Sequence, residues 1–294
     1  MDYFLALIVS GLLSGPVYAV VGLALVVVYR ASGVLNFSLG EWVGIGARVS
    51  GVGVAGMGLP LLIAALAAGA VMAILARLFS FVVVKRLLGR PVIAIVMATL
   101  ALGVLMQGGS AIALRGLPQE LPPLFDDAVW RIGDIPAPPA RLLASAVAIL
   151  LALAVMAFFR FSRAGVALRA IADDPGAAAG VGVDAPRYLA LAWMISAGLA
   201  VAGGVLWSID GLGGFGMALV LAKVLPVAVI GGLSSFGGVF VGAAAVGLAE
   251  SLAAGYLDPL IGAGSSALVG SALVIAMLWA RPTGIFGQGR IERV

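Results

Sequence analysis

A long uncharged stretch at the start of the chain decides where this protein can fold. Residues 3–29 form a run of 27 positions without a charged side chain. A helix needs about 20 apolar residues to cross the hydrocarbon core of a bilayer, so this run is long enough to span one. Asp2 precedes the run in place of the basic residues that begin a cleavable signal peptide, and the apolar stretch is longer than in such peptides. We therefore predict a retained membrane-spanning helix.

The composition of the whole chain agrees with a membrane location. Of the 294 residues, 63% are hydrophobic and 10% are charged, whereas soluble domains are about half apolar and a quarter charged. So few charged side chains cannot cover a water-facing surface, and we predict an integral membrane protein in contact with a lipid bilayer. The chain contains neither Cys nor His, which excludes disulfides, thiol catalysis and most transition-metal sites. The net charge of +4 is attributed to loops that orient the protein, and no nucleic-acid partner is expected.

Further apolar stretches follow the first one. They are too long for strands and lack the in–out alternation of barrel strands, so helices that satisfy their own backbone hydrogen bonds are expected. The fold class that we predict is an all-α integral membrane protein, a polytopic helical bundle of about 8–10 membrane segments, some of them short or broken. Residues 1–294 are expected to form a single transmembrane domain. The predicted segments are 4–29, 38–56, 59–84, 91–114, 141–160, 188–209, 217–233, 237–256 and 264–280.

The basic residues are distributed unequally between the loops that connect these segments. Three lie within apolar segments, namely Arg48, Arg77 and Lys223. Three lie on the side expected to be external, namely Arg115, Arg131 and Arg141. The other eleven share the opposite side: Arg30, Lys85, Arg86, Arg90, Arg160, Arg163, Arg169, Arg187, Arg281, Arg290 and Arg293. Because cytoplasmic loops are enriched in Lys and Arg, we predict a periplasmic N-terminus and a cytoplasmic C-terminus. This orientation requires an odd number of crossings, and nine fits if the short segments 38–56 and 217–233 are counted.

Two long loops separate the apolar segments. Residues 115–140 contain six prolines and four acidic residues, and we predict a periplasmic loop that is either an inert connector or a docking surface for an external partner. Residues 160–187 are predicted to be cytoplasmic and to contain two short helices, over 163–172 and 175–181. These helices are either a simple connector or a lever that a soluble partner grips.

Short local signals define the two helices of the cytoplasmic loop. Ser162 can cap the first helix, because a serine hydroxyl accepts from a free backbone N–H of the first turn. Asp173 and Asp174 followed by Pro175 end that helix. Gly182 then permits a sharp exit from the second helix.

Glycine-containing patterns suggest close helix contacts. The spacing GxxxG occurs at Gly11/Gly15, Gly40/Gly44 and Gly238/Gly242, and in membranes it allows helices to approach closely, within the chain or with a second subunit. The stretches LNFSLGEWVG (35–44) and LSSFGGVFVG (233–242) also share a polar turn that leads into a Gly-rich helix. Short, Gly-interrupted segments in corresponding halves are pointers to a transport site, so both turns are expected to face one central region.

Several motifs together resemble one known family. NFSLGEW (36–42) resembles the NFAHGE signature of the LivH-like permeases of branched-chain amino-acid ABC transporters. RAGVALRAIADDPGAAAGVGVD (163–184) resembles the coupling loop of that family, VLPVAVIGGLSSFGGVFVGAAAVGLAE (224–250) its GG-x4-GG-type segment, and RPTGIFG (281–287) its ending. The resemblance covers nearly the whole chain.

The resemblance implies a heteromeric importer in the bacterial inner membrane. In it, this chain pairs with a second homologous permease, two cytoplasmic ATPase subunits and a periplasmic solute-binding protein. The chain lacks a GxxxxGK[ST] phosphate loop, so ATP and Mg²⁺ are expected on the ATPase subunits and no cofactor or metal in this chain. The chain itself is expected to be non-catalytic.

The two polar turns indicate the pathway residues, and the resemblance indicates the residues that contact the ATPase. The translocation pathway or its support is assigned to Asn36, Phe37, Ser38, Gly40, Glu41, Ser234 and Ser235. Contact with the ATPase is assigned to Arg169, Asp173, Asp174, Ala178, Ala179 and Gly182. The family's Ala-His pair is replaced here by Ser38 and Leu39, which leaves the solute open among branched-chain or hydrophobic amino acids, urea, amides and carboxylates.

Three interpretations of Glu41 fit the residues around it, because a carboxylate at membrane depth needs a partner or water. Glu41 is an acid at a helix start in the headgroup region, favoured by the helix dipole. Alternatively it pairs with Arg48, Arg77 or Lys223 as a structural lock, or it lines the pathway. We favour a turn close to the pathway with Glu41 as structural support beside it.

Alternating access driven by ATP is therefore the mechanism that we expect. Two other transporters remain as alternatives: a simple-sugar ABC permease, and an ion-coupled secondary transporter that would use Glu41, Lys223 and Glu250 for its coupling ion.

Overall fold

The computed structural model describes residues 2–87, 89–125, 130–132, 135–212, 217–262 and 264–287. Its first half contains α1 (Asp2–Ser32), α2 (Leu39–Gly51) with the π-helical stretch η1 (Val52–Gly56), α3 (Leu61–Phe79) with the π-helical stretch η2 (Ser80–Val84), α4 (Lys85–Leu87) and α5 (Val92–Ala113). The second half contains β1 (Trp130–Ile132), β2 (Ile135–Ala137), α6 (Pro139–Phe161), α7 (Arg163–Asp173), α8 (Pro175–Gly180), α9 (Ala185–Asp210), α10 (Met217–Gly231), α11 (Phe236–Tyr256), α12 (Asp258–Ile261) and α13 (Ser265–Ala280).

The predicted helical membrane protein is confirmed. Among the described residues, six helices are long and apolar enough to cross a membrane: α1, α3 with its extensions, α5, α6, α9 and α11. The remaining predicted segments correspond to shorter helices, namely α2 with η1, α10 and α13. The short segments at 38–56 and 217–233 are thus helical over 39–56 and 217–231, and each is bounded by a non-helical turn on its N-terminal side or its C-terminal side.

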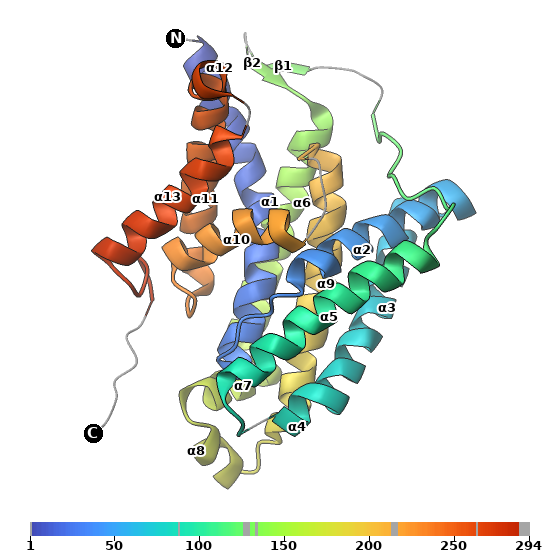
Figure 1. Cartoon of the computed structure of the whole chain (residues 1–294), viewed down its shortest axis with the longest axis vertical. Coiled ribbons are helices and arrows are strands. Elements are labelled where there is room, and N and C mark those ends of the chain that lie inside the picture. Colours follow the sequence, from blue (N-terminus) through green and yellow to red (C-terminus); the bar gives the residue numbers. More distant parts are fainter. Residues whose placement is uncertain are drawn as a thin grey trace.

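Helix α1 is the centre of the bundle (Figure 1). It packs against α6, α9, α10 and α11, and from Val17 to Val28 every residue is buried. A helix that is apolar on all sides is suited to such an interior position. The Gly11/Gly15 spacing brings α1 against α11, because a Cβ added at Gly11 would lie 2.6 Å from the carbonyl oxygen of Gly247. This GxxxG pair therefore serves a contact within the chain.

The outer helices leave large apolar side chains uncovered. Helices α3 and α5 lie on one side of the bundle and α13 on the other (Figure 1). Their exposed residues include Leu62, Ile74, Leu105, Ile112 and Leu268. Such surfaces are stable where lipid or another membrane subunit covers them.

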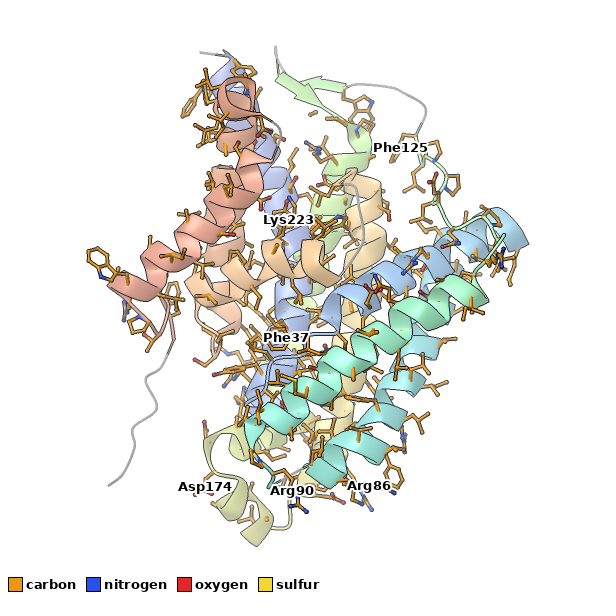
Figure 2. All side chains as sticks on the ribbon, viewed as in Figure 1. Phe37, Arg86, Arg90, Phe125, Asp174 and Lys223 are labelled. Carbon is orange, nitrogen blue, oxygen red and sulfur yellow. The ribbon has the colours of Figure 1, made fainter. Side chains whose placement is uncertain are left out.

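The two ends of the molecule carry different elements. Figure 1 shows α4, α7 and α8 at one end, and β1, β2, α12 and the start of α1 at the other. Figure 2 shows Arg86, Arg90 and Asp174 close to the first end, with Phe125 on the loop far from them. Two of the loops predicted to share the cytoplasmic side, residues 85–90 and 160–187, therefore lie at one end. Arg290 and Arg293, which were predicted to belong to the same side, lie outside the described residues.

The loop between α5 and α6 contains the two strands found among the described residues, β1 and β2. Strands β1 and β2 form an antiparallel pair in which Trp130 is opposite Ala137. The prolines of this loop oppose helix formation and favour extended backbone. Helix α6 begins immediately afterwards with Pro139 in its first turn, where a missing N–H costs nothing.

Candidate functional site

The predicted turn before α2 is held together by its own polar side chains. Oδ1 of Asn36 accepts from the backbone N–H of Ser38 at 3.1 Å and from the Ser38 hydroxyl at 2.6 Å. The indole N–H of Trp42 donates to the Ser38 oxygen at 2.7 Å. Asparagine suits such a turn because its side chain can bind the backbone two residues further on. Ser38 in turn links the loop to the first turn of α2, which begins at Leu39.

This turn lies inside the bundle. The backbone N–H of Phe37 donates to the hydroxyl oxygen of Thr99 at 3.3 Å. Thr99 is seven residues into α5, which corresponds to roughly 10 Å along the helix from its start at Val92. Asn36 is 2% exposed and Ser38 is fully buried. Thr99 was not singled out in the sequence, because an isolated threonine in an apolar helix carries no local signal of its partner.

Glu41 is buried in the first turn of α2 and faces Arg48 of the same helix. Its Oε2 lies 3.7 Å from Nη2 of Arg48, and the Glu41 side chain is 2% exposed whereas that of Arg48 is 26% exposed. Arg48 also donates from Nε to the Gly44 carbonyl at 3.2 Å. Of the three interpretations, the paired carboxylate agrees best with this geometry, since a headgroup acid would be exposed.

The second predicted turn lies between α10 and α11. The hydroxyl oxygen of Ser235 caps α11 by accepting from the backbone N–H of Gly238 at 3.0 Å, and Ser234 is half-buried. Phe236 lies under the guanidinium of Arg30, 5.0 Å from ring centroid to Cζ. Helix α2 packs against α10, which leads into this turn. The helices that adjoin the two turns, α2 and α10, therefore pack against each other. The first turn contacts Thr99 of α5, whereas Phe236 after the second turn contacts Arg30 of α1.

The predicted cytoplasmic helix pair is present as α7 and α8. Ser162 caps α7 by accepting from the backbone N–H of Gly165 at 2.9 Å. Asp174 ends α7 and caps α8, since its Oδ1 accepts from the N–H groups of Gly176 and Ala177 at 2.8 and 2.9 Å. Gly182, two residues after the end of α8, has φ +84°, a backbone conformation that favours glycine.

The polar residues of this pair are mostly used inside the chain. Nη1 of Arg169 donates to the Phe159 carbonyl at 2.6 Å and Nη2 to the Arg160 carbonyl at 3.3 Å, so Arg169 caps the end of α6. Ala178 is 3% exposed and faces into the helix pair, whereas Ala179 and Asp173 are exposed. Of the two alanines that were expected to permit close approach of a partner, only Ala179 is at the surface.

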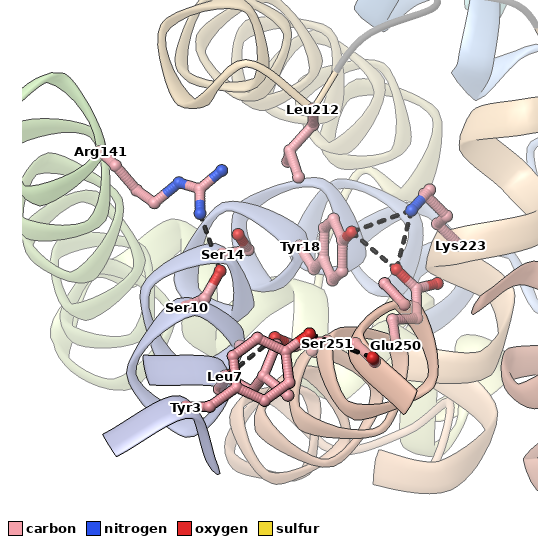
Figure 3. A pocket seen from close by; sticks show the side chains of 14 residues that line it. Tyr3, Leu7, Ser10, Ser14, Tyr18, Arg141, Leu212, Lys223, Glu250 and Ser251 are labelled. Atoms are coloured by element: carbon pink, nitrogen blue, oxygen red, sulfur yellow. Dashed lines mark hydrogen bonds and ion pairs between the residues drawn. The ribbon is translucent and has the colours of Figure 1, made fainter. Parts of the chain in front are cut away.

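A cluster of ionisable side chains lies between α1 and its neighbours (Figure 3). The sequence named two of its members, Lys223 and Glu250, as candidate groups for a coupling ion but did not reveal that they pair with each other. Nζ of Lys223 on α10 lies 2.8 Å from Oε2 of Glu250 on α11 and 3.1 Å from the hydroxyl of Tyr18 on α1. Nε of Arg141 at the start of α6 lies 2.9 Å from Oδ1 of Asp210 at the end of α9. The only sequence signal was the presence of single ionisable residues within or at the ends of apolar segments.

The cluster borders a cavity of about 340 Å³. The Tyr18 hydroxyl donates to Oε2 of Glu250 at 2.8 Å. The Ser14 hydroxyl donates to Oδ2 of Asp210 at 2.9 Å. Tyr18 and Ser14 are separated by one helical turn on α1, which explains why a single helix can contact both ion pairs.

The whole chain matches one family of membrane proteins. The sequence profile of the family described as "Branched-chain amino acid transport system / permease component" matches residues 7–280. The chain is 31% identical to the high-affinity branched-chain amino acid transport system permease protein LivH of Escherichia coli (strain K12), over 99% of this chain and 98% of LivH. It is 27% identical to the corresponding permease protein BraD of Pseudomonas aeruginosa, over 99% and 98% of the two chains. A solved structure, PsaBC from Streptococcus pneumoniae in complex with Fab, aligns with 94% of this chain and 92% of that chain, with a TM-score of 0.49 and 17% identity.

Proposed function

This chain belongs to the branched-chain amino acid transport permeases, the non-catalytic transmembrane components of an ABC transport system, and from that premise we propose that it carries leucine, isoleucine and valine across the bacterial cytoplasmic membrane. The observation that carries the proposal is the match over almost the full length of the chain. The six long apolar helices and the polar turn at depth are the parts that a permease of this kind needs.

The proposed complex contains four kinds of subunit. This chain pairs with a second homologous permease, binds two ATPase subunits on the cytoplasmic side and receives solute from a periplasmic binding protein. ATP and Mg²⁺ bind to the ATPase subunits. The exposed apolar faces of α3, α5 and α13 support the pairing, because one of them can be covered by the second permease while lipid covers the others.

The helix pair α7 and α8 is the proposed contact with the ATPase. Its exposed surface carries Ala179 and Val181, and the Val181 side chain is 80% exposed. Arg169 of α7 donates to the Phe159 carbonyl at the end of α6. A displacement of α7 and α8 by the ATPase would therefore also move α6. A short rigid helix of this kind can sit in a groove of a partner and follow its motion.

The turn 34–38 and the turn 232–235 are proposed to lie beside the translocation pathway. Buried polar groups at membrane depth are expensive unless they hydrogen-bond or line a path for polar solute. Oδ1 of Asn36 accepts from the Ser38 hydroxyl and backbone N–H. Glu41 with Arg48 is the proposed support that holds the start of α2 in place.

The end that carries α4, α7 and α8 is proposed to face the cytoplasm, with the N-terminus and the hairpin β1–β2 in the periplasm. The arginines near α4 and α7 support this orientation, because positive loops are retained on the cytoplasmic side.

Reconstitution of the complete complex tests the function. Proteoliposomes that contain both permeases and both ATPase subunits, with ATP inside the lumen that corresponds to the cytoplasm and the binding protein outside, should accumulate radiolabelled leucine. Omitting ATP or the ATPase subunits should abolish this accumulation. If urea, short amides or aromatic carboxylates are accumulated and leucine is not, the solute assignment is wrong while the permease role stands.

A further inference from the structure

Charged side chains of α6, α9, α10 and α11 and the polar side chains of Ser14 and Tyr18 on α1 gather at one cavity. The proposed pathway turns and coupling helices do not explain this arrangement. Tyr18, Arg141, Lys223 and Glu250 all line the cavity (Figure 3). Asp210, which pairs with Arg141 at 2.9 Å, is not one of the lining residues. The cavity also touches Tyr3, near the start of α1, so it extends from one end of that helix to about its middle.

Charged groups in this position are costly. Glu250 and Asp210 are 6% and 4% exposed, and both lie in helices that are long and apolar enough to span a membrane. Replacing a buried ion pair by apolar side chains is often neutral or stabilising, so stability alone does not require these charges. Ionisable residues inside membrane segments usually mark the path or the binding site of a solute.

The cations of the cluster have unused hydrogen-bond donors. An ammonium group has three N–H bonds, and Lys223 uses one for Glu250 and one for Tyr18. Arg141 donates from Nη1 to the Ser10 hydroxyl at 2.8 Å and from Nη2 to the Asp210 carbonyl at 3.3 Å, which leaves one N–H on each of these nitrogens. Both remaining sets of donors are free within the part of the chain that the structure describes.

Among the described residues, both acids of the cluster have a buried oxygen that accepts no hydrogen bond, Oδ1 of Asp210 and Oε1 of Glu250. Oε1 of Glu250 is buried and accepts no hydrogen bond from any described residue, whereas Oε2 accepts from Tyr18 and Lys223. A buried carboxylate oxygen without a donor costs free energy. Oε1 lies toward Gly270 of α13, which does not line the cavity, so a ligand in the cavity would approach Glu250 from the side of Oε2.

We propose that this cavity binds the zwitterionic α-amino acid group of the transported solute. The carboxylate of the solute accepts from Lys223, its ammonium group donates to Glu250, and its apolar side chain lies against Leu7 and Leu212. The proposal rests on the proposed function, because it names the place where this permease itself recognises an amino acid.

The balance of charge selects a zwitterion over an ion. Each cation already has its own carboxylate, Lys223 with Glu250 and Arg141 with Asp210, so the two pairs carry no net charge. A ligand with only a negative charge would bind Lys223 but offer no donor to Glu250, and a ligand with only a positive charge would do the reverse. An α-amino acid carries both charges on neighbouring atoms, which matches two opposite charges held 2.8 Å apart.

The size and walls of the cavity agree with one small apolar amino acid. Its volume of about 340 Å³ lies near the lower end of the roughly 300–1,000 Å³ of small-molecule pockets. The walls between the charges are formed by Leu7, Leu212, Ala254 and the backbone of Gly247 and Gly255. Leu7, Leu212 and Ala254 give an apolar side chain a surface to pack against, while Tyr3, Ser10, Ser14 and Ser251 also line the cavity.

A ligand series on the purified wild-type complex, without the binding protein, tests the requirement for both charges. Radiolabelled leucine is bound at equilibrium and competed with unlabelled leucine, leucinamide (no carboxylate) and 4-methylpentanoate (no ammonium). We expect both analogues to bind about ten- to a hundredfold more weakly than leucine, because each loses a hydrogen bond to a charged group. Equal competition by leucine and either analogue, or no leucine binding at all, would overturn the proposal.

Paired substitutions distinguish a binding site from a structural lock. The neutral double variant Lys223→Gln/Glu250→Gln removes both charges without leaving either unpaired. The swapped variant Lys223→Glu/Glu250→Lys keeps an ion pair and reverses its direction. In a binding site both variants lose leucine binding about tenfold or more, because the reversed pair would force the side chain of the solute away from its wall. Recovery of wild-type binding by the swapped variant would show that the pair is only a lock.

Matched tyrosine variants provide the control. Tyr18→Phe removes the hydroxyl that contacts Lys223 and Glu250, and should weaken leucine binding. Tyr256→Phe removes a hydroxyl at the end of α11, where the ring packs edge-on against Tyr3, and should not. Equal binding by these two variants would count against the site.

The failure of this inference can be separated from the failure of the proposed function. ATP-driven leucine uptake at the wild-type rate by the neutral double variant would overturn the cavity as a site and leave the permease function intact. Zwitterion-selective leucine binding that depends on Lys223 and Glu250, in a complex that takes up no leucine, would support the cavity and overturn the transport assignment. If the neutral variant does not assemble, the ligand series on the wild-type complex decides the question.

Discussion

The Ser38 hydroxyl is buried between Asn36 and the turn's own helix, 2.6 Å from Oδ1 of Asn36. The same hydroxyl oxygen accepts from the Trp42 indole N–H. One small side chain therefore satisfies two other buried polar groups at the point where the chain enters α2. Removing it leaves the buried Trp42 indole N–H without this acceptor, while Oδ1 of Asn36 keeps only the backbone N–H of Ser38. A buried donor without a partner costs free energy.

Ser38→Ala is therefore expected to destabilise the protein by about 1–3 kcal/mol. The measurement is the unfolding midpoint of the detergent-solubilised chain. Ser50→Ala is a matched control, because Ser50 is also buried in α2 but its hydroxyl only donates to the Gly46 carbonyl four residues earlier. If Ser38→Ala and Ser50→Ala lower the unfolding midpoint equally, the Ser38 hydrogen bonds contribute no more to stability than the Ser50 hydrogen bond.

Glu41→Gln and Arg48→Gln are expected to lower stability by similar amounts, about 1 kcal/mol each, since the ion pair is long and its arginine is partly exposed. If the two residues act as a pair, the double variant should lose no more than either single variant. The measurement is the same unfolding midpoint. Strictly additive losses would show that Glu41 acts through other partners.

Asn36→Leu is expected to reduce leucine uptake strongly while assembly and ATPase activity remain, because the turn is proposed to border the pathway. Uptake by proteoliposomes and co-purification of the ATPase subunits are measured on the same preparation. Uptake at the wild-type rate by both Asn36→Leu and Glu41→Gln, in a fully assembled complex, would remove this turn from the pathway.

Ala179→Glu is expected to abolish co-purification of the ATPase subunits without affecting insertion of the permease, because it places a charge on the exposed surface of α8. Ala179→Ser keeps the size of the side chain and should retain binding. Ala178→Glu should in addition lower the stability of the permease alone, since Ala178 is buried in the helix pair. Normal ATPase binding by Ala179→Glu would exclude this surface from the contact.

Cysteine labelling tests the orientation, and the chain has no cysteine of its own. Glu120→Cys in the exposed loop after α5 should react with a membrane-impermeant maleimide on intact spheroplasts. Arg86→Cys, exposed beside α4, should react only after the membrane is permeabilised. The reverse result would invert the proposed topology.

Asp258 gives a prediction about pH. The Ser265 hydroxyl and backbone N–H hold the pKa of Asp258 below its usual range, with the side-chain hydrogen bond as the larger cause. A carboxyl whose pKa is lower in the folded protein contributes stability above the unfolded value of about 3.9, and this contribution is lost as the pH falls through the folded value. Wild-type protein should therefore exceed Asp258→Asn in thermal stability at pH 6, and the difference should shrink below about pH 4. A difference that does not change with pH would contradict this assignment.

Local signals were sufficient to predict several elements. Ser162 predicts the start of α7, and Asp174 with Pro175 predicts the break between α7 and α8, because capping acts between residues two or three positions apart. The nine apolar segments were also identified, because a span is defined by its own composition. The hairpin β1–β2 was not predicted, since strands this short depend on pairing with each other.

The candidate site was predictable only in part. The motif NFSLGEW drew attention to the turn, but its contact with Thr99 joins residues 62 positions apart. Arg169, which is assigned to the proposed ATPase contact, also caps α6 at Phe159, and this contact could not be predicted because it requires α7 to fold back against the end of α6. The charged cavity was missed because Tyr18 and Glu250 are 232 positions apart.

The sequence by itself determined that this is a helical membrane protein, where its apolar segments begin and end, and which loops carry the positive charge. These properties follow from residues close together in the chain, because hydrophobic length and charge near a span act locally. Only the tertiary structure decided that α1 is the central helix and that Lys223 meets Glu250 and Arg141 meets Asp210. Helix packing in a membrane depends on close contact of small residues and on side chains from distant segments, so the partner of a buried charge is set by how the helices assemble.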